Sequence, residues 1–294
     1  MKIEIKEISH PVFNVKDVRL FIKRIDKLHP LVSGNKFFKL KYNLLECERQ
    51  GLNTLLTFGG AYSNHIAASA FIANSKGLKS IGIIRGEECL PLNHTLRFAL
   101  ENGMKLHYVS RSDYKKKNTT NFFESLKNKF GNFYLIPEGG TNQLAIQGSK
   151  EIIDSGDYQD YICCSVGTGG TIAGIINASS AEQIVIGFPA IKGFKQLERD
   201  INSWTNSTNY TFINDYVGRG YAKINNELVN FINKFNITHN VPLDAIYNGK
   251  MFMGIMDLIG KDYFPKGSSI LAIHTGGLQA NQGMTDRLGV ALPL

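Results

Sequence analysis

Two lysines three residues apart, Lys36 and Lys39, open a segment of helical pattern that follows Gly34-Asn35. Residues three apart share one face of a helix, so both side chains leave its first turn in the same direction. Cations at this end of a helix oppose the helix dipole and need compensation. A lysine converted to a Schiff base, beside a second lysine paired with a phosphate, would supply it. The simpler alternative is two solvated lysines at an exposed helix start.

A glycine-rich segment, Ser165 to Thr171 (SVGTGGT), ends an apolar run and leads into a second helical pattern. Glycines let backbone N–H groups approach an anion, and the hydroxyls of Thr168 and Thr171 add donors beside a helix N-terminus. The segment lacks the Gly-Lys-Ser/Thr of a P-loop and the spacing of a dinucleotide fingerprint. It therefore predicts a phosphate cup, with a ligand-free turn between strand and helix as the alternative.

A third loop, residues 59–65 (GGAYSNH), follows the apolar run 54–58. Ser63 is suited to cap the helix that comes next. Ser63 and Asn64, together with the N–H groups of that first turn, could also cradle a carboxylate or a phenolate oxygen. Helix capping alone is the plainer interpretation, and the two are compatible.

Apolar runs of strand length alternate with helical segments along the whole chain. This alternation predicts an α/β protein whose parallel-type sheets are flanked by helices. In such sheets ligands bind at the carboxyl ends of the strands, where the three loops above would lie. The strand candidates are residues 18–23, 54–58, 80–84, 105–109, 133–136, 161–165, 184–188 and 270–274.

The composition of the 294 residues is that of an ordinary globular protein, with 43% hydrophobic residues and a formal net charge of +8. The basic residues are scattered, and the one dense run, Lys115-Lys116-Lys117, is expected to be a solvated helical face, so no nucleic-acid partner is predicted. The four cysteines make no CxxC pair and no zinc spacing, which favours a reducing compartment and no metal. No signal peptide or membrane-spanning stretch is visible, so a cytoplasmic enzyme without a membrane partner is expected.

Taken together, the loops resemble the D-cysteine desulfhydrase and 1-aminocyclopropane-1-carboxylate (ACC) deaminase family, among the tryptophan-synthase-β-like enzymes that use pyridoxal phosphate (PLP). The resemblance implies a fold type II PLP enzyme with two lobes, PLP in the cleft between them, and a homodimer. Residues 1–48 and 142–294 would form the large PLP-binding lobe, and residues 49–141 the small one. Seven segments match in the family's order: residues 23–26, 34–40, 58–65, 137–142, 165–171, 243–250 and 274–277.

The resemblance also implies roles for single residues. Lys36 would carry PLP as a Schiff base and shuttle protons, and Lys39 would face the cofactor phosphate. Asn64 would donate to the phenolic oxygen of the cofactor, and Tyr247 would pack on its ring. Tyr221 matches a second tyrosine near the substrate.

Ser63 matches the site of the substrate carboxylate and is also a candidate for proton transfer. The implied catalytic residues are Lys36, Ser63, Tyr221 and Tyr247, and the implied substrate-binding residues are Ser63, Asn64 and His65. The implied cofactor-binding residues are Lys36, Lys39, Asn64, Gly167, Thr168, Gly169, Gly170, Thr171, Tyr247, Asn248 and Thr275.

Three positions that differ between the two branches of the family point away from ACC deaminase: His65, Asn248 and Thr275. Asn248 also departs from the threonine that is usual in desulfhydrases. ACC deaminases have glutamate and leucine at the last two, and a glutamate near the pyridine nitrogen would strengthen the electron sink. The prediction is therefore a D-cysteine desulfhydrase that forms pyruvate, sulfide and ammonia. The alternatives are ACC deaminase, another small D-amino acid lyase, and a non-catalytic phosphate-ligand protein. The apolar residues 66–68 and Phe37-Phe38 depart from the family's polar pattern and leave the substrate open.

Overall fold

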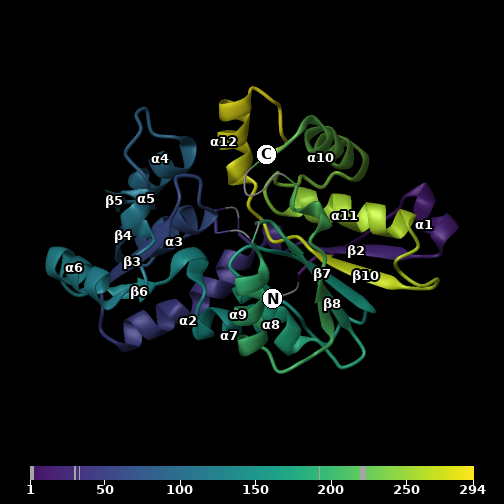
Figure 1. The fold of residues 1–294 in the computed structure, drawn as a ribbon, viewed down its shortest axis with the longest axis horizontal. Helices are drawn as coiled ribbons and strands as arrows, with labels where there is room; N and C mark the ends of the chain where they lie inside the picture. Colours follow the sequence, from purple (N-terminus) through teal and green to yellow (C-terminus); the bar gives the residue numbers. More distant parts are fainter. Residues whose placement is uncertain (1–2, 30, 33, 192, 219–222) are drawn as a thin grey trace.

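The structure, a computed structural model, describes residues 3–29, 31–32, 34–191, 193–218 and 223–294. Its strands form two separate sheets, a six-stranded one in the order β1-β2-β10-β7-β8-β9 and a four-stranded one in the order β5-β4-β3-β6 (Figure 1). All eight predicted strands are confirmed to within one residue at each end. The strands are β1 Ile5–Ile8, β2 Arg19–Lys23, β3 Thr54–Gly59, β4 Lys79–Arg85, β5 Met104–Val109, β6 Tyr134–Ile136, β7 Tyr161–Val166, β8 Ile184–Pro189, β9 Tyr210–Phe212 and β10 Ser269–Ile273.

Every strand pair is parallel except β1 with β2, which confirms the α/β fold of parallel sheets flanked by helices. The prediction missed β1 and β9. Both lie at the edges of the larger sheet, and most of their residues stay at least partly exposed, so neither has the continuous apolar run of a buried strand.

Helices cover both sheets, and the predicted cap of α3 is in place: Ser63 accepts a backbone hydrogen bond at the start of that helix. Asn225 caps α10 in the same way. The helical prediction for Lys115-Lys116-Lys117 is wrong, because α5 ends before it and the run forms a turn. The helices are α1 Pro11–Lys16, α2 Asn35–Arg49, α3 Asn64–Ser75, α4 His94–Glu101, α5 Arg111–Tyr114, α6 Thr120–Phe130, α7 Gln143–Lys150, α8 Gly170–Ala178, α9 Lys195–Trp204, α10 Asn226–His239, α11 Asn248–Gly260 and α12 Gln279–Leu288, with a short 3-10 turn at Glu138–Gly140.

The strand β7 shows why both faces of the larger sheet are apolar. Ile162 and Cys164 point into the core beneath α8, whereas Cys163 points into the core beneath α11. Because successive side chains alternate between faces, a strand covered on both sides reads as one continuous apolar run. The thiols of this strand are buried and unpaired, as expected of small hydrophobic residues.

The helix α2 joins the two halves of the molecule. Phe38 packs in a core of the six-stranded sheet, and Leu40 and Cys47 pack in a core of the four-stranded sheet. The four strands of the smaller sheet all lie between residues 54 and 136, inside the predicted small lobe, while its boundaries at residues 49 and 141 stay a prediction. No helix in the described ranges is long and apolar enough to span a membrane. The homodimer and the cytoplasmic location stay predictions.

Candidate active site

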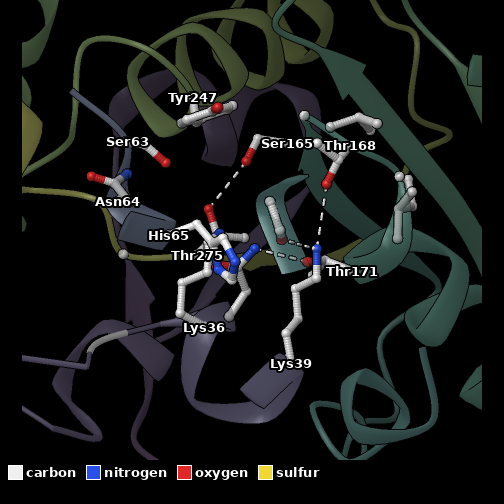
Figure 2. A pocket seen from close by; sticks show the side chains of 17 residues that line it. Lys36, Lys39, Ser63, Asn64, His65, Ser165, Thr168, Thr171, Tyr247 and Thr275 are labelled. Atoms are coloured by element: carbon white, nitrogen blue, oxygen red, sulfur yellow. Dashed lines mark hydrogen bonds between the residues drawn. The ribbon is translucent and has the colours of Figure 1, made fainter. Parts of the chain in front are cut away.

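A cavity with about 650 Å³ of empty space lies between the two halves, at the carboxyl ends of β3 and β7 and the first turns of α2, α3 and α8 (Figure 2). Of the residues predicted to form the site, Gly170 and Asn248 are buried outside its wall, and Tyr221 lies outside the described residues. The structure brings the others together on the wall of the cavity: Lys36, Lys39, Ser63, Asn64, His65, Gly167, Thr168, Gly169, Thr171, Tyr247 and Thr275.

Lys36 is held by residues that are far away in the sequence. Gly34, with a φ of 67°, is the N-cap of α2, and Asn35 is the first residue of the helix. An ideal Cβ on Gly34 would lie 2.0 Å from the carbonyl oxygen of Thr275, and the N–H of Asn35 donates to that oxygen at 3.2 Å. Only glycine fits this contact, so the first turn of α2 packs directly on the chain after β10.

The amine of Lys36 is tuned for nucleophilic chemistry. Burial lowers its pKa from the usual 10.5 to about 8, and the carboxylate of Asp244 acts in the opposite direction. Nζ donates to Oδ1 of Asn35 at 3.0 Å, which directs it along the cavity wall. A lysine whose pKa is near 8 is partly unprotonated near neutral pH and can attack a carbonyl carbon.

Lys39 lies one helical turn further on and is 1% exposed. Its ammonium group donates to the carbonyl oxygen of Gly139 at 2.6 Å, to Thr141 at 2.8 Å and to Thr168 at 3.4 Å. All three acceptors are neutral, and burial, together with the charge of Lys36, holds the pKa of Lys39 well below its usual range. The alternative of two solvated lysines is therefore excluded. Among the described residues the buried cation has no anionic partner, and a phosphate would provide one.

The predicted phosphate cup has the expected form. The segment after β7 turns into the first residues of α8, where backbone N–H groups without helical partners and the positive end of the dipole favour an anion. The hydroxyls of Thr168 and Thr141 are hydrogen-bonded to each other, and Thr171 accepts from Nδ2 of Asn35 at 2.8 Å. The phosphate cup, the first turns of α2 and the 3-10 turn after β6 therefore surround one site that could hold an anion.

The start of α3 offers a second polar site on the same cavity. Ser63 is its N-cap and accepts from the N–H of Ile66 at 3.3 Å, which leaves the hydroxyl proton available to a ligand. Asn64 follows, and its Oδ1 accepts from Nε2 of Gln279 at 3.0 Å. A helix N-terminus with a free hydroxyl proton suits a carboxylate.

Tyr247 closes the cavity on the side of the larger sheet (Figure 2). Its ring packs against Gly167, where an ideal Cβ would lie 3.1 Å from Cε1 of the tyrosine. Its backbone N–H donates to Oδ1 of Asp244 at 2.7 Å, which fixes the start of α11 behind it. An aromatic face held in this way can stack on a flat ring.

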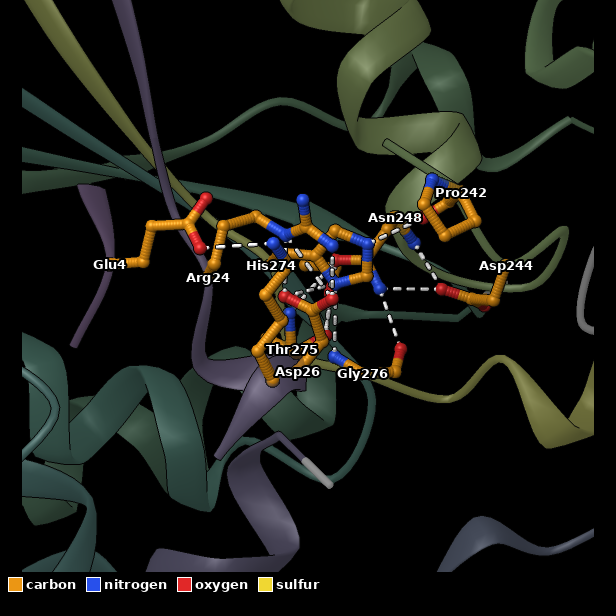
Figure 3. A network of polar contacts seen from close by, with 11 residues as sticks. Glu4, Arg24, Asp26, Pro242, Asp244, Asn248, His274, Thr275 and Gly276 are labelled. Atoms are coloured by element: carbon orange, nitrogen blue, oxygen red, sulfur yellow. Dashed lines mark hydrogen bonds and ion pairs between the residues drawn. The ribbon is translucent and has the colours of Figure 1, made fainter. Parts of the chain in front are cut away.

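Asn248 lies behind the cavity wall in a polar network (Figure 3). Its Nδ2 donates to Asp244 and, at 2.8 Å, to the carbonyl oxygen of Gly276, while its Oδ1 accepts from the N–H of Thr275 at 3.1 Å and its hydroxyl at 3.2 Å. The amide is fully engaged with protein groups, and Asn248 does not line the cavity, so its role toward the cofactor stays a prediction. The hydroxyl of Thr275, 3.1 Å from that of Ser165, faces the cavity in its place.

The imidazole of His65 is anchored in one tautomer. The hydroxyl of Thr57 donates to the carbonyl oxygen of Ile136 at 2.8 Å, so at its 2.7 Å contact with His65 it accepts from Nε2–H. Nδ1 is then an acceptor, and it is buried without a protein partner. Burial, with the charges of Lys36 and Lys39, holds the pKa of His65 well below its usual range. His65 therefore lines the cavity as a neutral imidazole.

Replacing Thr57 by valine tests this assignment. The variant keeps the shape of the side chain but leaves Nε2–H of His65 without an acceptor, so we expect about 1–3 kcal/mol lower stability and a mixture of tautomers. Nitrogen NMR of the ring in the cofactor-free protein should show an unprotonated Nδ1 in the wild type. Thr54→Val, on the same strand, is the control and should leave the ring signals unchanged. A wild-type ring protonated on Nδ1 would contradict the assignment.

Several residues at the site were not singled out from the sequence. Thr141 falls in the matched segment 137–142, and Asn35 and Ser165 fall in other matched segments, so the motif carried their signal although no role followed from it. Thr57 and Gln279 gave no signal, because a threonine inside a strand and a glutamine at a helix start are ordinary residues there.

Comparisons with known proteins agree with this geometry. The family model described as "Pyridoxal-phosphate dependent enzyme" matches residues 8–276. The chain belongs to this family. It is 32% identical, over 92% of its length and 75% of the relative, to the bifunctional D-cysteine desulfhydrase/1-aminocyclopropane-1-carboxylate deaminase of Arabidopsis thaliana. A crystal structure of an ACC deaminase homologue superimposes with a TM-score of 0.84 at 25% identity, covering 98% of this chain and 93% of the other.

A hydrogen sulfide-producing enzyme from Fusobacterium nucleatum has the same fold, with a TM-score of 0.67 at 15% identity over 94% of this chain and 96% of the other. Membership makes the protein an enzyme that depends on PLP, and its residues fit that cofactor. The buried cation of Lys39 and the cup at α8 suit the phosphate, and the face of Tyr247 suits the ring. Lys36, with its lowered pKa, suits the aldehyde carbon.

Proposed function

We propose that this PLP-dependent enzyme is a lyase that eliminates sulfide from D-cysteine. The observation that carries the proposal is the lack of an acidic group at the cavity: among the described residues that line it there is no carboxylate. The buried carboxylate behind that wall, Asp244, accepts four hydrogen bonds from the backbone of residues 246–248 and the amide of Asn248. A neutral partner such as Thr275 makes a weaker electron sink, which suffices when a thiolate leaves from Cβ.

The residues at the cavity divide the work. The cofactor supplies the electron sink for charge that develops at Cα. Lys39 and the cup at α8 hold the phosphate, and Ser63 with the first turn of α3 orients the substrate carboxylate. Lys36 would remove the Cα proton, and its lowered pKa keeps part of it in the free-base form.

The overall reaction balances without another reactant besides water. The Cα–H and Cβ–S bonds of D-cysteine break, and the sulfur leaves with a proton as hydrogen sulfide. Cβ then takes up a proton and becomes the methyl group, and water replaces nitrogen at Cα, which gives pyruvate and ammonia. No oxidant or reductant takes part.

The test is sulfide release by the PLP-loaded protein, with D-cysteine and L-cysteine assayed side by side and Lys36→Ala as the blank. We expect sulfide and pyruvate in equal amounts from D-cysteine and much less from L-cysteine. Sulfide release from L-cysteine alone would contradict the proposal. A lack of sulfide from both enantiomers, measured on protein with bound PLP, would also contradict it.

ACC deaminase is the second candidate, and the names of the Arabidopsis relative and of the crystal structure favour it. Ammonia and 2-oxobutanoate formed from ACC, measured in the same preparation, would identify it. Turnover of ACC without sulfide release from D-cysteine would replace the first candidate by the second.

A further inference from the structure

A hydrogen bond between side chains 215 residues apart joins the two halves of the molecule at the cavity. Nε2 of Gln279 donates to Oδ1 of Asn64 at 3.0 Å. Gln279 is the first residue of α12, which packs with the six-stranded sheet, and Asn64 is the first residue of α3, which covers the four-stranded sheet. Both side chains are half-buried, so the bond is partly shielded from water.

This bond decides which edge of the Asn64 amide faces the cavity. A carboxamide has an acceptor edge and a donor edge, and Gln279 occupies the acceptor edge. The amide also passes close to the backbone of Gly277, where an ideal Cβ would be 2.7 Å from Nδ2 of Asn64. The close approach of that glycine leaves the amide little freedom to tilt, so Nδ2 remains the group that Asn64 offers to a ligand.

We propose that Gln279 is a positioning residue, which holds the N–H edge of Asn64 toward the phenolic oxygen of the bound cofactor. The inference rests on the proposed placement of Asn64 beside that oxygen. The oxygen is negatively charged in the bound cofactor, so a donor stabilises it and a carbonyl oxygen turned toward it would repel it. For this role Gln279 needs neither a charge nor a contact with the cofactor, because it acts through Asn64.

Two substitutions separate orientation from packing. In Gln279→Glu the carboxylate can only accept, so the Asn64 amide must turn and present Oδ1 to the cofactor. In Gln279→Leu the packing volume is nearly kept, but the amide loses the partner that fixes it. Both variants should fold, and thermal melting of the cofactor-free proteins checks this.

The readout is the pH at which the absorption band of the bound cofactor titrates. The donor stabilises the phenolic oxygen most when the neighbouring imine nitrogen has lost its proton, because the oxygen then carries its full charge. Loss of the donor makes that proton harder to remove, so the titration should move to higher pH, by about one pH unit in Gln279→Glu and by less in Gln279→Leu. A purely structural role would change melting and leave the titration in place.

Asn64→Ala and Gln282→Glu are the controls. Gln282 lies one turn further along α12 and pairs with Asp286 at 2.8 Å, so its variant adds the same charge to the same helix away from Asn64. If Asn64→Ala does not move the titration, the proposed placement of Asn64 is wrong. If it does, and neither Gln279 variant follows, only the role of Gln279 is overturned. An equal shift in Gln282→Glu would also overturn it, because charge alone would then explain the result.

Discussion

Lys36→Ala is expected to purify without the yellow colour that borohydride bleaches, and to lose turnover by at least about 10³-fold. The reason is that the described cavity offers one other lysine, Lys39, whose ammonium group is already bonded to Gly139, Thr141 and Thr168. The measurements are the absorption spectrum with and without borohydride, and mass spectrometry of the reduced protein to locate the modified residue.

Lys41→Ala is the matched control for this experiment. Lys41 belongs to the same helix but pairs with Glu151 at the surface, at 2.7 Å, so its loss should change neither the spectrum nor turnover. A reducible chromophore and full activity in Lys36→Ala would show that the cofactor is attached elsewhere.

Lys39→Met is expected to weaken the binding of PLP and, in the cofactor-free protein, to raise the free energy of unfolding. With the cofactor, it removes the cation that faces the phosphate, so affinity for PLP should fall about 10- to 100-fold. Without the cofactor, it removes a buried ammonium group that has only neutral acceptors, so the free energy of unfolding should rise.

The second effect should depend on pH with a definite sign. The pKa of Lys39 is lowered in the folded protein, so the unfolded chain binds the extra proton. The cofactor-free wild type therefore gains stability as pH rises from the folded toward the unfolded pKa, and the advantage of Lys39→Met should shrink over that window. Melting curves across pH, with Lys41→Met as the control, check this. A variant less stable than the wild type without PLP would contradict it.

The strands could be predicted because the larger part of both sheets is covered on two faces. A run such as Tyr161–Val166 is apolar throughout, and its length separates it from a helix. The edge strands β1 and β9 could not be found this way, because they lack a continuous apolar run and the pairing that makes them strands comes from their neighbours.

The site could be predicted as far as its residues belong to local motifs. Lys36, Ser63 and Thr168 each sit in a short segment whose loop or helix start is visible in the sequence. Gln279 and Thr57 act only through partners that the fold brings to them, at separations of 215 and 8 residues, and neither residue type is unusual where it stands.

Asn248 shows that a sequence motif does not predict the direction of each side chain. Its position beside Tyr247 suggested contact with the cofactor, but the helix start turns its amide toward Asp244, and Thr275 stands between it and the cavity. The order of residues along a motif gives their proximity and not the direction in which each side chain points.

The packing of Gly34 on Thr275 has a consequence for protein synthesis. The residues that begin the lysine helix are made early, but the backbone against which they pack lies close to the carboxyl end of the chain. The strand β2, which precedes α2 in the sequence, is likewise paired with β10. A nascent chain in which β10 has not yet been made therefore lacks the backbone on which the first turn of α2 packs, and fragments that stop before β10 should not retain the vitamin-derived cofactor.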